Sequence, residues 1–181
     1  MTDTDDNDLG FAPPHDQPVP YLARLREYYA TLGYGAPYRW AQYADVPFTP
    51  LTAALTTLTV GLITTAAPYQ PDKGEQGPGA PYNASAKFFT VYSGASAVDH
   101  DLRISHISYD RQHTSAEDMN TWFPLPALRR AVARGRFGRL AARFHGAPTN
   151  RSQRATLDID CVELLRRCRH DQLDAVLLVA T

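Results

Sequence analysis

The chain has 181 residues, of which 44% are hydrophobic and 20% charged, with a formal net charge of -1 and two cysteines. This composition excludes a disulfide scaffold and a zinc array, and no apolar run reaches the roughly 20 residues of a membrane span. The acidic N-terminus also lacks the basic and apolar segments of a signal peptide. We therefore expect one domain of ordinary size in a soluble, cytoplasmic protein.

Acidic and basic residues are separated along the chain. Residues 1–16 hold five aspartates and no Lys or Arg, which predicts a disordered acidic tail before a single domain at 17–181. Residues 119–157 contain no acid and eight arginines. These arginines are Arg129, Arg130, Arg134, Arg136, Arg139, Arg143, Arg151 and Arg154. They form either an anion-binding surface or a set of solvated helix faces, and solvated faces are the more common outcome.

The first half of the domain is predicted to contain one helix, one strand and one loop. Apolar residues at helical spacing predict a helix over 21–32, ended by Gly33. The uninterrupted apolar run at 58–67 is typical of a strand that is buried on both faces of a parallel sheet. Gly, Pro and polar residues at 68–85 then predict a long surface loop.

Strands and helices alternate in the second half. Strands are expected at 88–93, 102–108 and 173–181, helices at 125–135 and 156–171, and a strand or loop at 139–146. This alternation predicts an α/β fold with a mostly parallel sheet and Rossmann-like, doubly wound layering, in which the apolar last strand is buried. Ligand sites of such sheets lie at the carboxyl ends of strands, and the last strand reaches that edge as the chain ends at Thr181.

Cys161 and Cys168 lie in the same predicted helix. At a rise of about 1.5 Å per residue their Cα atoms are about 10 Å apart, beyond the limit of about 7 Å for a disulfide. We therefore expect both cysteines to be small core residues rather than a redox pair.

A group of polar side chains surrounds the end of the predicted strand 102–108. Its members are His106, Asp110, His113, Glu117, Asp118 and Asn120. These residue types suit a divalent metal, a general acid and base, or a substrate-facing loop, and a solvated loop is the plain alternative. No zinc signature, phosphate loop or hydrolase elbow is present. His145 either helps neighbouring arginines to hold a carboxylate or is a partly buried structural histidine.

Several sequence blocks, which lie within residues 20–181, occur in the order found in one family. They are YLARLREYYATLGYGAPYRWAQYADVPFTPL, LTVGLITTAA, DLRISHISYD, EDMNTWFPLPALRR and DQLDAVLLVAT. On these blocks the chain resembles the selenoprotein B subunits of glycine, sarcosine, betaine and D-proline reductases. The segment at 143–160 resembles the family only loosely, and the loop at 68–85 is longer and richer in Pro and Gly than expected for the family.

The resemblance implies an oxidoreductase that reductively cleaves a bond alpha to the carboxyl group of glycine, sarcosine, betaine, D-proline or a related compound. It implies a catalytic selenocysteine or cysteine after the last strand, a residue that this chain does not contain. We therefore expect the natural protein to continue beyond Thr181, because an unrecoded selenocysteine codon is read as a stop. The chain as written would then be truncated and inactive.

The resemblance also assigns a substrate site and partners. By their match to the central block, His106, Tyr109, Asp110 and Asn120 are expected near the bound substrate, and no metal is expected. The expected partners are a carboxylate-bearing small molecule, a second reductase subunit and a second copy of the chain, with no membrane.

Two other interpretations stay open. The arginine-rich half would suit a non-catalytic module that binds a carboxylate or another anion, and nucleic acid is a less expected ligand because aromatic residues do not interleave the arginines. A pseudoenzyme subunit whose stop at Thr181 is genuine would instead pair with another chain through its terminal strand.

Overall fold

The computed structural model describes residues 20–35, 41–47, 49–77, 80, 83–104, 112–113, 117–148 and 152–180. The chain divides into two compact units, within residues 1–46 and 47–181. In the first unit, the predicted helix is confirmed as α1 (Tyr21–Thr31). Gly33 follows with a φ of 75°, a left-handed conformation that favours glycine and ends the helix.

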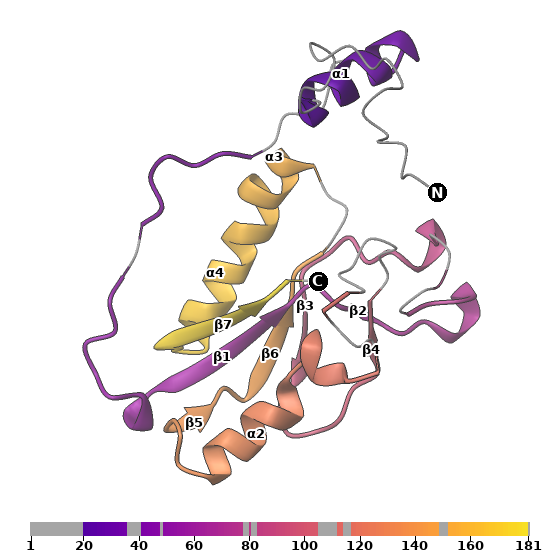
Figure 1. Cartoon of the computed structure of the whole chain (residues 1–181). Helices are drawn as coiled ribbons and strands as arrows, with labels where there is room; N and C mark the ends of the chain where they lie inside the picture. The colour runs from indigo at the N-terminus through magenta and orange to yellow at the C-terminus, as the bar shows by residue number, and fades with distance from the viewer. Residues whose placement is uncertain are drawn as a thin grey trace, which may run out of the picture. The chain divides into compact units, whose positions relative to one another are not determined.

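The second unit is built on a five-stranded sheet (Figure 1). Its strands are β1 (Thr59–Thr64), β3 (Tyr92–Ala95), β5 (Arg139–Leu140), β6 (Arg143–Gly146) and β7 (Ala175–Val179). β1 pairs in parallel with β5 and β6 along one edge and with β7 along the other, while β3 pairs antiparallel with β6. An α/β fold with a mostly parallel sheet is therefore confirmed.

Helices connect the parallel strands, as parallel pairing requires. They are α2 (Leu125–Ala133), α3 (Gln153–Ala155) and α4 (Cys161–His170), with a π-helical turn at Thr156–Asp160 between α3 and α4. α2 lies between β1 and β5 in the chain, and the α3–α4 segment connects β6 to β7. None of the helices in the described part of the chain has the length and apolar character that a bilayer crossing requires.

β1 is buried along its whole length. Strands on both of its edges satisfy the backbone, and its side chains are covered on both faces, which explains why the sequence here is an unbroken apolar run. At its carboxyl end, the Thr64 hydroxyl donates to the carbonyl of Trp122 at 2.6 Å and accepts from the amide of Ala66 at 3.1 Å. The buried core comprises Leu62, Ala66, Leu102, Ile104, Trp122, Phe123, Leu125 and Phe144.

β7 shows that the expectation of a buried last strand was wrong. The strand is parallel to β1, but Val176, Leu177 and Leu178 are 41%, 41% and 64% exposed. Among the described residues, β7 has a neighbouring strand only on its β1 edge. An apolar run thus predicts the strand correctly without revealing that it lies at the edge of the sheet.

Three other expected elements change their boundaries. The strand expected at 88–93 begins only at Tyr92, and the strand expected at 102–108 is described as β4 (Leu102–Arg103). The last helical segment begins before residue 156, at Gln153, because the Ser152 side chain caps it by accepting from the Ala155 amide at 3.0 Å.

Candidate functional site

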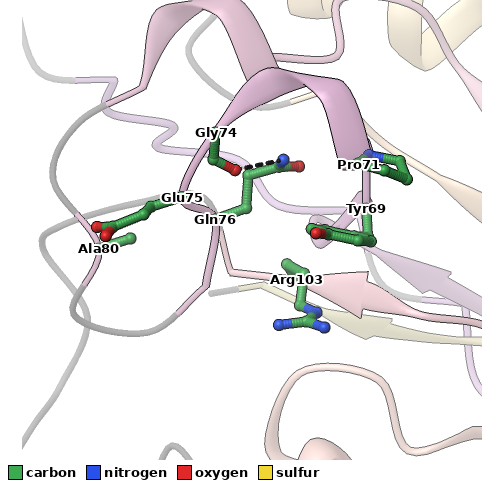
Figure 2. Close-up of a pocket in the computed structure, with 7 residues that line it drawn as sticks. All are labelled: Tyr69, Pro71, Gly74, Glu75, Gln76, Ala80 and Arg103. Atoms are coloured by element: carbon green, nitrogen blue, oxygen red, sulfur yellow. Dashed lines mark hydrogen bonds between the residues drawn. The ribbon is translucent and has the colours of Figure 1, made fainter.

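A polar pocket of about 660 Å³ lies beside a short antiparallel ribbon formed by β2 (Ala67–Pro68) and β4 (Figure 2). It is lined by Tyr69, Pro71, Gly74, Glu75, Gln76, Ala80 and Arg103. The pocket lies just after the carboxyl end of β1 in the chain. β1 ends at Thr64, and the chain then enters β2 at Ala67. Ligand sites of open α/β sheets lie at this carboxyl edge, and the volume is typical of small-molecule pockets.

Side chains that bond to the backbone hold the loop that forms one wall of the pocket. The Gln76 side chain accepts from the Gln70 amide at 3.0 Å and donates to the Gln70 and Gly74 carbonyls at 2.6 and 3.1 Å. Asn83 Nδ2 donates to the Glu75 carbonyl at 3.0 Å. These bonds tie the described part of the predicted loop together, and a wall that is already held by such bonds loses little conformational freedom when a ligand binds.

Arg103 brings a positive charge to the pocket. Its guanidinium carbon lies 4.7 Å from the centre of the Tyr69 ring, a cation–π contact, and Figure 2 shows the two side chains next to each other. Nε and Nη2 donate to the Asp101 carboxylate, with Nη2 at 2.8 Å, and these hydrogen bonds lower the pKa of Asp101. The guanidinium is thus fixed in one plane.

Gly77 lies near Nη1, the third nitrogen of this guanidinium. Its φ of 128° favours glycine, and a Cβ at this position would lie 3.8 Å from Nη1 of Arg103. An arginine that is held against an aromatic ring at a polar pocket suits a carboxylate or phosphate oxygen.

The predicted substrate-site residues His106, Tyr109 and Asp110 lie outside the described residues. Asn120 is described, and its side chain bonds within the fold. Its Nδ2 donates to Asp118 Oδ1 at 2.8 Å, and its Oδ1 accepts from the Ala127 amide in the first turn of α2 at 3.2 Å. Asn120 therefore accepts a hydrogen bond from a backbone amide in the first turn of α2 that has no partner within the helix.

The remaining sequence candidates do not converge on one site within the described chain. His113 lies in an exposed turn, and no three His, Cys, Asp or Glu side chains among the described residues are placed to hold a metal ion. Cys161 is exposed, which corrects the expectation that it is a core residue. Cys168 is half-buried, and burial raises the pKa of its thiol, which disfavours the reactive thiolate.

A second polar cluster lies between α4 and the sheet and contains His145. This histidine is completely buried on β6, with Nδ1 2.8 Å from Ser93 Oγ and Nε2 3.2 Å from Asp171 Oδ2. Burial lowers the pKa of His145, so the neutral ring places its Nε2–H toward Asp171 and accepts the Ser93 hydroxyl at Nδ1. Ser, His and Asp in this order are also the elements of an activated serine nucleophile.

Two arginines show that this cluster is structural. Arg167 Nη1 donates to Ser93 Oγ at 2.7 Å, so the hydroxyl oxygen is bonded to α4 as well as to the histidine. Arg143 Nε donates to Asp171 Oδ2 at 2.7 Å, and this bond lowers the pKa of Asp171 to about 2. The cluster therefore fastens α4 to the sheet, and the Ser93 oxygen is engaged by two partners.

Sequence reasoning missed most of this cluster. The basic residues at the end of α4 fit a favourable interaction with the helix dipole, and that explanation does not predict a contact with the sheet. The signal that could have identified it is the helical spacing of Glu163, Arg167 and Asp171, which puts all three on one face.

No protein-family model, curated protein or solved structure matches the chain. The family resemblance therefore rests on the sequence blocks alone.

We expect the free energy of unfolding to decrease as the pH is lowered, because of the polar cluster of Ser93, His145 and Asp171 between α4 and the sheet. Below about pH 6.5, the unfolded chain takes up a proton that buried His145 resists, so the free energy of unfolding decreases. Between about pH 4 and about pH 2, protonation of Asp171, whose folded pKa is about 2, removes a further contribution.

Urea unfolding between about pH 7 and about pH 5 measures the first of these losses. His145→Gln should abolish most of the slope over that range, while His113→Gln, in an exposed turn, should keep it. Equal slopes in the wild-type chain and His145→Gln would contradict this role of His145.

Proposed function

We propose that the chain binds a small carboxylate-bearing molecule in the Tyr69–Arg103 pocket, as part of a reductase that cleaves a bond alpha to that carboxylate. Binding is supported by one observation above all, the guanidinium of Arg103 held beside a preorganised polar pocket. The type of reaction is supported by the resemblance to the selenoprotein B subunits. Glycine, sarcosine, betaine and D-proline, the substrates of that family, all carry the carboxylate that Arg103 would bind.

The pocket offers opposite charges to a substrate of this kind. The carboxylate would bind at Nη1 of Arg103, beside Gly77. Glu75, which also lines the pocket, would face the positively charged nitrogen of an amino acid or betaine, and the ring of Tyr69 offers that nitrogen an aromatic face. Together these residues would fix the orientation of the bond to be cleaved.

In this proposal the nucleophile is the selenocysteine or cysteine that the resemblance implies after the last strand. β7 is parallel to β1, so a segment leaving its carboxyl end starts at the edge of the sheet where β1 leads into the pocket wall. The selenolate would attack the carbon alpha to the carboxylate and displace the nitrogen as an amine, forming a selenium–carbon bond. A neighbouring thiolate would then attack the selenium, so that the selenium–carbon bond breaks, the carbon takes up a proton and a selenide–sulfide bond forms. A dithiol reductant would reduce that bond and restore the selenolate. A helix N-terminus after the strand would stabilise the anion.

The proposal also includes Rossmann-like, doubly wound layering. From β1 the chain passes through α2 to β5 and β6, and from β6 it passes through α4 to β7 on the opposite edge of β1. Right-handed crossovers in these two directions would put α2 and α4 on opposite faces of the sheet.

A non-catalytic carboxylate-binding module is the second candidate function. It is favoured by the composition of the pocket, because the lining residues that the structure describes include no cysteine, serine or histidine. The two cysteines of the sequence lie on α4, one exposed and one half-buried with a raised pKa. Binding and catalysis therefore need separate tests.

Titration calorimetry tests the binding site. We expect D-proline or betaine to bind the wild-type chain, and Arg103→Ala to weaken that binding about tenfold to a hundredfold through loss of a charged hydrogen bond. Arg103→Lys should recover only part of the loss because an ammonium lacks the planar fork. Arg136→Ala, in the exposed turn after α2, is the matched control. Equal affinity in Arg103→Ala and the wild-type chain would contradict the assignment.

Alkylation tests the reductase. Protein purified from the organism that makes it should contain, after the segment matching β7, a residue that reacts with iodoacetamide at about pH 6, where ordinary thiols are protonated. The 181-residue chain, with only Cys161 and Cys168, is the control and should stay unlabelled at that pH. If peptide mass spectrometry finds no such residue in the natural protein, the reductase is excluded and the binding module is retained.

A further inference from the structure

Part of the apolar surface of α4 faces solvent instead of the sheet. On the half-buried side of the helix, Arg167 bonds to Ser93 and Glu163 pairs with Arg167. Leu164 and Cys168 are also half-buried, but Val162 and Leu165 are 60% and 50% exposed. A helix whose only apolar contact were with its own sheet would carry polar residues at these two exposed positions.

The exposed residues of this helical segment form one stripe. Asp158, Val162, Leu165 and Arg169 follow each other at intervals of four, three and four residues, the spacing at which helical side chains share a face. All four are exposed. Leu157, which is 47% exposed, lies two turns before Leu165 and extends the apolar part. We call these five residues the α4 stripe.

We propose that the α4 stripe is a homodimer contact in which two α4 helices pack antiparallel across a two-fold axis. In this arrangement Val162 packs against the partner's Leu165, and Leu165 against the partner's Val162. Asp158 then lies opposite the partner's Arg169 at each end. The pairing is isologous, because each residue makes the same contact in both copies.

The charge pattern of the α4 stripe favours a second copy of this chain as its binding partner. The stripe has an acid at one end, apolar residues in the middle and a base at the other end, so it is complementary to itself when one helix is reversed. Parallel alignment would instead bring like charges together. The apolar centre is small, so we expect a dimer that dissociates on dilution rather than an obligate one.

β7 is a second exposed apolar surface, and association through β7 is the alternative to association through the α4 stripe. Leu178 on this edge strand is 64% exposed, and an open strand edge is itself a site of self-association. A charge placed at Leu178 would disrupt strand pairing but would leave the α4 stripe intact. The effects of substitutions on β7 and α4 therefore distinguish the two modes of association.

Sedimentation velocity of the full chain from about 1 µM to about 200 µM measures the association. We expect a concentration-dependent dimer in the wild-type chain and in Leu178→Lys, and a monomer at all concentrations in Leu165→Asp. A wild-type monomer throughout this range overturns the proposal. So does a monomeric Leu178→Lys, which would assign the contact to β7.

Charge reversal tests the antiparallel pairing itself. Asp158→Arg alone and Arg169→Asp alone should each weaken dimerisation about tenfold or more, because each puts like charges opposite one another twice. The double variant Asp158→Arg/Arg169→Asp restores opposite charges and should recover the wild-type dissociation constant. Failure of the double variant to recover overturns the pairing, and circular dichroism establishes that every variant is folded.

Discussion

The structure of the second unit depends on the burial of β1. This one strand pairs with β5, β6 and β7, so the whole parallel part of the sheet is organised around it. Both of its backbone edges are used and both faces are covered, which restricts its sequence to small and apolar residues with two threonines at its buried ends. Among the described strands, β5 and β7 pair with β1 alone, while β6 pairs with β3 as well.

This constraint also determines where chemistry can occur. The carboxyl end of β1 itself is closed by the bonds of Thr64 to Trp122 and Ala66. The chain then continues into the β2–β4 ribbon, where Tyr69 and Arg103 line an open polar pocket. On the opposite edge of β1, β7 pairs with β1 alone among the described strands, and Val176, Leu177 and Leu178 remain exposed. The Tyr69–Arg103 pocket and the exposed apolar residues of β7 therefore lie in different parts of the second unit.

The sequence correctly predicted those elements in which the order of apolar and polar residues reflects which side of the element is buried. The apolar run of β1 and the amphipathic pattern of α2 belong to this group, and both helix ends at Gly33 and Gly135 are set by glycine φ values of 75° and 66°. The apolar run of β7 predicted a strand but not its exposure, because burial depends on neighbours that are distant in sequence. The first three residues of the α3–α4 segment were not predicted, because they are stabilised by the Ser152 cap and lie before the apolar residues that indicate a helix.

The candidate site was less predictable than the fold. Arg103 and Tyr69 are separated by more than thirty residues, and only the β2–β4 pairing brings them together. The buried cluster of Ser93, His145 and Asp171 likewise draws on β3, β6 and the end of α4, so no local motif could reveal it. Asn120 was singled out for its residue type, and its side chain instead supports α2.

Amide hydrogen exchange followed by NMR tests the central position of β1 most directly. The account predicts that the amides of Val60 to Thr64 exchange most slowly in the chain, and that those of β7, which has one open edge, exchange faster than their partners in β1. Exchange of the β1 amides as fast as those of α1, none of whose residues is buried, would contradict it.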